Sequence, residues 1–119
     1  MIKRLFTALA LMSAATTPAT SETPRVANPR AGREVADKIC AACHVVASDQ
    51  KQAPVSKPPA PSFEQIARGP KADDWTLRTF LASTHSSISH PDAMPNPQLS
   101  DDQIRDVTAY ILSLREQRK

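Results

Sequence analysis

The sequence predicts an all-α protein of four to five short helices. Apolar residues repeat at helical spacing near the C-terminus, and capping and stop signals bound several shorter segments. No stretch shows the alternation of apolar and polar residues that is typical of a strand. The 119 residues are enough for one domain, but only 4% of them are aromatic. A core with so little bulk is expected to need a staple or a cofactor.

Residues 1–20 are expected to form a cleaved secretory signal peptide. Lys3 and Arg4 open the chain, an apolar run of about 11 residues follows, and small residues come next. The run is too short for a membrane span, although an uncleaved anchor or a core helix is the alternative. We therefore expect a signal at 1–20, a flexible leader at 21–28 and a folded domain at 29–117, exported to the periplasm.

The charge balance gives no support to nucleic-acid binding. The chain has 15 Lys and Arg against 12 Asp and Glu, and two of the basic residues lie in the predicted signal. The remaining 13 basic residues nearly balance the 12 acidic ones, and they form no basic stripe. No other stretch approaches the length of a membrane span, so we expect none in the mature protein.

The first helix is predicted to begin at Asn28 and to run into Cys40. Asn28 is a capping residue, and Pro29 suits the first helical position. Val35 and Ile39 would share one face of this helix, four residues apart. Residues 47–60 then form a polar, proline-containing loop. Loops of this length in compact domains are usually functional, for example in wrapping a ligand.

Two short helices are expected in the middle of the chain. Residues 62–68 would form the first, which Gly69 and Pro70 would close. Asp73 or Asp74 would cap the second, which would fade over residues 83–87. Its apolar positions fall at helical spacing, with an aromatic residue at the start: Trp75, Leu77, Phe80 and Leu81.

The last helix has the clearest signals. Ser100 and Gln103 form the pattern of a capping box. Acidic residues 101 and 102 suit the positive end of the helix dipole, and basic residues at 115, 118 and 119 suit the negative end. A buried stripe is predicted from apolar residues at helical spacing, with Tyr110 close to it: Ile104, Val107, Ile111 and Leu114.

Residues 40–44, with the sequence C-A-A-C-H, predict the attachment site of one covalent c-type haem. Cys40 and Cys43 could each bond one vinyl group of the porphyrin, and His44 could bind the iron. A disulfide, a redox dithiol pair and a zinc site are the alternatives. A redox pair normally lies in an α/β context, and zinc would need two more ligands with recognisable spacing.

Met94 is the candidate for the second axial ligand of the iron. It is the only methionine after the predicted signal, and it lies in a polar segment among Pro91, Pro95 and Pro97. His85 and His90 are the rival ligands. A thioether is a soft donor that favours ferrous iron, and a six-coordinate iron leaves no vacant position for a substrate.

With these residues in place, the chain resembles the class I c-type cytochromes, the small bacterial group with one haem. The resemblance extends over about residues 31–114. It rests on Gly32, Val35 and Ala36 before the C-x-x-C-H motif, on Pro61 before Phe63, on residues 94–97, and on D-V-x-A-Y-I at 106–111. Ala60 stands where the family usually has glycine, and Ala36 where it often has an aromatic residue.

The resemblance implies a cytochrome c fold, with short helices around the haem and the N- and C-terminal helices crossing at Gly32. It also implies that the carbonyl of Pro61 accepts a hydrogen bond from His44. The expected function is one-electron transfer, as a soluble shuttle or as the cytochrome subunit of a dehydrogenase. Partners would be a dehydrogenase or quinol-oxidising complex and a terminal oxidase or reductase. A haem-based gas sensor or a peroxidase-like enzyme with a distal site that can open is the alternative.

The loop at 47–60 carries Lys51 and Lys57, which could form a docking surface near the haem edge. An ordinary solvated loop is the alternative explanation. Docking through weak electrostatic attraction would make the rates of electron transfer sensitive to ionic strength.

Overall fold

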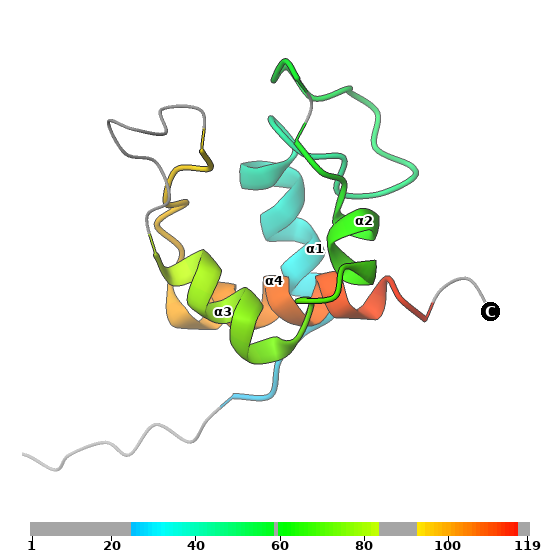
Figure 1. Ribbon diagram of the computed structural model, residues 1–119. Coiled ribbons are helices and arrows are strands. Elements are labelled where there is room, and N and C mark those ends of the chain that lie inside the picture. Colours follow the sequence, from blue (N-terminus) through cyan, green and yellow to red (C-terminus); the bar gives the residue numbers. More distant parts are fainter. Residues whose placement is uncertain (1–24, 59, 84–92, 117–119) are drawn as a thin grey trace, which may run out of the picture.

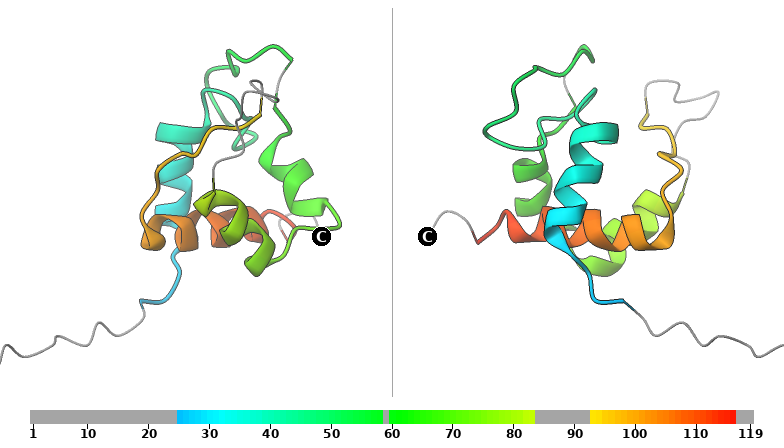
Figure 2. Two further views of the ribbon diagram at one scale, coloured as in Figure 1. Left: turned by 60° about the vertical axis from the view of Figure 1, so that its left-hand side comes forward. Right: turned by 180° about the vertical axis from the view of Figure 1, so that it is seen from behind.

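The computed structural model describes residues 25–58, 60–83 and 93–116. In chain order its elements are α1 (Pro29–Val35), the π-helical turn η1 (Ala36–Cys40), α2 (Phe63–Arg68), α3 (Asp74–Ala82) and α4 (Asp101–Ser113). These ranges contain no strand, so the all-α prediction is confirmed. α1 stands across α4, and α2 and α3 also pack against α4 (Figures 1 and 2).

Each α-helix begins at a side chain that accepts backbone hydrogen bonds of the first turn. Asn28 caps α1, as predicted, with Pro29 at the first helical position. The predicted capping box of α4 is present: the Gln103 N–H donates to Ser100 Oγ at 3.3 Å, and the Ser100 N–H donates to Gln103 Oε1 at 2.9 Å. Ser62 and Gln65 form the same pair of bonds at the start of α2. These caps define where the helices start.

The first helix reaches Cys40 as predicted, but its last turn is wider than an α-helical turn. The Ala41 N–H donates to the carbonyl of Ala36, five residues back, at 3.0 Å. Val35 packs on the core, whereas Ile39 is 43% exposed. The two side chains therefore do not share a buried face, because the wider turn rotates the later side chain away from the α-helical position.

The predicted apolar stripe of α4 lies in the core. Ile104, Val107 and Ile111 are buried, and Leu114 is partly buried against the same cluster. From α3, Leu77 and Leu81 join this core. Phe80, the third apolar residue predicted for that face, is not buried with them, because it is 42% exposed.

The crossing of α1 and α4 depends on the absence of a side chain at Gly32. A Cβ at this position would lie 2.0 Å from the carbonyl oxygen of Asp106 and 2.9 Å from the Cβ of Tyr110. The predicted close approach at Gly32 is therefore present. Its direct contacts are with Asp106 and Tyr110, which lie on either side of Val107 along α4.

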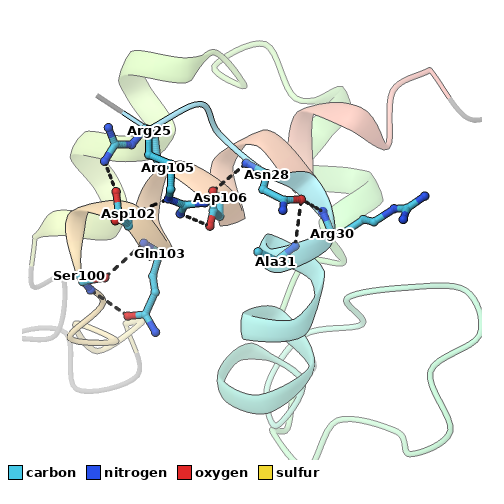
Figure 3. A network of polar contacts seen from close by, with 9 residues as sticks. All are labelled: Arg25, Asn28, Arg30, Ala31, Ser100, Asp102, Gln103, Arg105 and Asp106. Carbon is cyan, nitrogen blue, oxygen red and sulfur yellow. Dashed lines mark hydrogen bonds and ion pairs between the residues drawn. The ribbon is translucent and has the colours of Figure 1, made fainter. Parts of the chain in front are cut away.

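The end of the predicted leader lies against α4. Asp106 is 4% exposed, and its carboxylate accepts hydrogen bonds from Arg25 Nη2 at 2.6 Å and from the Asn28 N–H at 2.7 Å (Figure 3). Residues 25–28 are thus fixed to the crossing of α1 and α4. The signal, the rest of the leader, His85, His90 and the basic residues at 118 and 119 lie outside the described residues.

The connection between α2 and α3 is fastened by the C-terminal end of the fold. α2 ends at Arg68, as predicted, and Gly69 follows with φ −65° and ψ 152°. Gly69 is extended because the residue before a proline is disfavoured in the α conformation. The Arg115 guanidinium donates to the carbonyls of Ala67 and Ala72. Arg115 therefore links the end of α4 to the connection between α2 and α3. The sequence had predicted only a favourable interaction of this residue with the helix dipole.

Candidate haem-attachment site

His44 is buried and its ring is fixed by one short hydrogen bond. The side chain is 9% exposed, and Nδ1 lies 2.7 Å from the carbonyl oxygen of Pro61. Since a carbonyl can only accept, Nδ1 carries the proton and the lone pair of Nε2 is left for a metal. The ring of Phe63 packs beside the imidazole, with the two centroids 5.6 Å apart. The Pro61 contact implied by the family resemblance is present, and it orients His44 as metal-binding histidines usually are oriented.

The two cysteines lie in one tight turn that ends at His44. The carbonyl of Cys40 accepts the N–H of Cys43 at 3.1 Å and that of His44 at 2.9 Å. Cys40 is buried and Cys43 is exposed, and no disulfide joins them. Burial, with a smaller contribution from Cys43, raises the pKa of Cys40 to about 11. A redox dithiol pair needs a lowered thiol pKa, so this environment is unfavourable for thiol–disulfide exchange.

The described part of the chain does not provide the further ligands that a zinc site at the two cysteines would need. No group of three or more His, Cys, Asp and Glu side chains gathers there in an arrangement that could hold a metal ion. Of the alternatives to haem, the zinc site therefore has no geometric support within these residues.

The loop at 47–60 folds back over the attachment turn. The Val55 N–H donates to the carbonyl of Ala42 at 2.9 Å. The carbonyl of Cys43 accepts from Ser56 Oγ at 3.0 Å and from the Ala60 N–H at 3.3 Å. The loop thus saturates carbonyls that a tight turn would otherwise leave without partners. Its length serves to hold the attachment segment.

Met94 lies at the margin of the core. Its side chain is partly buried and packs against the cluster that includes Cys40 and Phe63. Downstream, Asn96 Oδ1 accepts the N–H of Gln98 at 2.8 Å, and Gln98 adopts a positive φ of 54°. This turn and the neighbouring prolines restrict the backbone that carries Met94. The rival ligands His85 and His90 lie outside the described residues.

The donor set and the packing both fit a c-type haem. Two thiols and an imidazole with a free Nε2 are the groups that attach and ligate such a haem, and the thioether of Met94 is a candidate for the second axial ligand. Among the described residues, Phe63 and Tyr110 are the only aromatic members of the buried core. Other apolar side chains remain exposed, among them Val45 and Phe80. The core is therefore short of the apolar volume that a porphyrin supplies.

Sequence reasoning missed the contacts that support the site from a distance. The Tyr110 hydroxyl, on α4, donates to the carbonyl of Val46 at 2.8 Å. Arg33 joins Asp37 at 2.9 Å and Asp49 at 2.8 Å, and its guanidinium carbon lies 5.9 Å from the centre of the Tyr110 ring. The four-residue spacing of Arg33 and Asp37 could have indicated that pair. No sequence signal points to the other three contacts.

Comparison with known proteins agrees with this geometry. A cytochrome c family model matches residues 29–115. Cytochrome c-552 of Bradyrhizobium diazoefficiens is 38% identical over 84 residues, which are 71% of this chain and 72% of that protein. No solved structure matches. No helix in the described ranges has the length and apolar character needed to cross a membrane. The chain belongs to the cytochrome c family, as a small class I c-type cytochrome that binds haem c covalently and carries electrons.

Proposed function

We propose that the protein is a periplasmic one-electron carrier with a closed haem site. Cys40 and Cys43 form the two thioether links, and His44 and Met94 are the axial ligands. The observation that carries this proposal is the buried imidazole of His44, whose Nδ1 is held by Pro61 and whose Nε2 remains available. The protein acts as a soluble shuttle or as the cytochrome subunit of a dehydrogenase.

The haem iron supplies the one-electron chemistry, and the chain controls its surroundings. The hydrogen bond to the carbonyl of Pro61 holds the imidazole of His44 in one orientation, so this ligand would rearrange little when the charge at the iron changes. The thioether of Met94 is a weak donor that favours the reduced state. With both axial positions filled, no position remains for a substrate, which is why this ligand set supports electron transfer instead of bond chemistry.

Closure of the distal site can be tested with carbon monoxide, which binds ferrous haem only when an axial position opens. We expect the reduced wild-type protein to bind carbon monoxide poorly and Met94→Ala to bind it readily. Leu99→Ala is the matched control, because Leu99 also lies in this segment and packs partly buried on the core. Ready binding by the wild type would contradict the carrier proposal and favour a gas sensor.

The loop that covers the attachment turn offers a surface for an acidic redox partner. Lys51 and Lys57 are exposed, and residues 50–60 contain no acidic side chain. Asp49, at the start of the loop, is already paired with Arg33 at 2.8 Å. Hexacyanoferrate, a small redox anion, is a suitable probe. Its electron exchange with the protein should slow as salt is added, and the double variant Lys51→Gln with Lys57→Gln should lose much of this dependence. An unchanged salt dependence would contradict docking at this loop.

Export rests on the pattern of residues 1–20, outside the described ranges. Deletion of these residues should abolish the haem-loaded protein in the periplasmic fraction, whereas the full chain should accumulate there with covalent haem. Haem-loaded protein in that fraction without the leader would contradict this assignment. Size-exclusion chromatography of the native extract separates the two forms of the proposal, because a free shuttle elutes at its own mass and a subunit elutes with its dehydrogenase.

A further inference from the structure

The side chain of Gln50 bridges the two ends of the attachment segment. Its Oε1 accepts the N–H of Val46 at 2.8 Å, and its Nε2 donates to the carbonyls of Gln52 at 2.7 Å and Ala41 at 3.4 Å. Ala41 lies between the two cysteines, and Val46 follows His44 by two residues. The side-chain amide of Gln50 therefore links Ala41, which precedes Cys43 and His44, to Val46, which follows them.

The place of this bridge makes it difficult for solvent to replace. Val46 is 0% exposed, so its N–H would have to be left without a partner if the amide were removed. The carbonyl of the same residue accepts the hydroxyl of Tyr110 at 2.8 Å, which ties it to α4. The turn that carries Gln50 is held from the other side, because Asp49 pairs with Arg33 of α1 at 2.8 Å. Gln50 thus links a turn held by α1 to Val46, which α4 holds directly.

We propose that Gln50 is a positioning residue that sets the placement of Cys43 and His44 relative to Cys40. The proposal deepens the proposed function, since it assumes haem attachment at these cysteines and ligation by His44. Pro61 orients the imidazole ring from its Nδ1 side, while Gln50 holds the backbone that carries the ring. Loss of the amide would leave the ring bond in place but would loosen the main chain on both sides of the ligand.

The haem-loaded protein tests this directly by amide hydrogen exchange. In Gln50→Ala, exchange of the Val46 N–H should accelerate about tenfold or more relative to wild type, because its only acceptor in the described residues is lost. Gln52→Ala is the matched control. Gln52 is another glutamine of this loop, its side chain is exposed, and its contact with Gln50 uses the backbone carbonyl only. Gln50→Glu keeps an oxygen acceptor and should keep most of the protection of Val46.

A second readout distinguishes positioning of the ligand from simple support of the loop. The haem methyl proton shifts of the ferric protein respond to the orientation of the axial imidazole, and the midpoint potential responds to its bond with the iron. Gln50→Ala should change both quantities, and Gln52→Ala should change neither. Unchanged Val46 exchange, or unchanged methyl shifts and potential in Gln50→Ala, would overturn the proposal. The exchange measurement does not involve the iron, so its outcome is independent of whether Met94 is the ligand.

Discussion

Substitution of Gly32 by alanine is predicted to weaken the α1–α4 crossing, although alanine is the better helix former. The new Cβ would lie 2.0 Å from the carbonyl oxygen of Asp106, whereas real Cβ contacts essentially never fall below 3.0 Å. The obstructing atom belongs to the backbone, so no change of rotamer can relieve the clash. The helices must separate by about 1 Å, and this loosens the packing of Ala36 and Val107, both 0% exposed.

The size of the effect follows from two opposed contributions. Overpacking of a core typically costs 1–3 kcal/mol, and a backbone clash places Gly32→Ala near the upper end, at about 3 kcal/mol. Replacement of glycine by alanine inside a helix returns about 1 kcal/mol. The free energy of unfolding should therefore fall by about 2 kcal/mol. Guanidinium denaturation of the haem-loaded protein, followed by circular dichroism, should show a midpoint lower by about 0.5 M for a domain of this size.

Gly69→Ala is the matched control, because it makes the same chemical change in the unfolded chain. At Gly69 a Cβ would lie 3.2 Å from its nearest neighbour, the carbonyl oxygen of Ile66, and the backbone φ of −65° suits any residue. Its free energy of unfolding should change by less than about 1 kcal/mol. If Gly32→Ala lowers the midpoint no further than Gly69→Ala, the close approach of the two helices does not limit stability and the reasoning fails.

Two further changes probe the polar contacts of α4. Asp106→Ala leaves the N–H of Asn28 without its acceptor and should lower the free energy of unfolding by about 1–3 kcal/mol in denaturant titrations, whereas Asp102→Ala, at a half-exposed carboxylate, should cost less than about 1 kcal/mol. Equal losses would refute this ranking. Burial raises the pKa of Tyr110, so its contribution to stability is complete below the unfolded value of about 10 and is lost as the pH rises above it. Tyr110→Phe, which also loses the bond to Val46, should therefore be less stable at neutral pH and should decline less between pH 9 and 11; a parallel decline would contradict the assignment.

Local signals in the sequence were sufficient to predict the helices. The caps at Asn28 and Ser100 and the apolar spacing of α4 each involve residues within a few positions of one another, and all are present. The exposure of Ile39, which was expected to share a face with Val35, was not predicted because a π-helical turn has no comparable local signature. The capping box of α2, at Ser62 and Gln65, follows the same pattern as that of α4 and could have been read from the sequence.

The supporting contacts of the site could not be predicted in the same way. The residues of the C-x-x-C-H motif are adjacent in the sequence, so haem attachment can be predicted from them without knowledge of the fold. Gln50, Asp106 and the hydroxyl of Tyr110 act through partners that only the packed chain brings near them. A lone glutamine in a polar loop looks the same in sequence whether it faces solvent or holds the backbone beside His44. The ring contact between His44 and Pro61 was predicted only because the family resemblance implied it.

The central claim, that His44 and Met94 together close the haem site, is tested most directly by near-infrared absorption of the ferric protein. Iron bound to methionine sulfur gives a weak band in this region. We predict that the band is present in the wild type and in Leu99→Ala and is absent from Met94→Ala. A wild type without the band, or a Met94→Ala variant that keeps it, would contradict the claim.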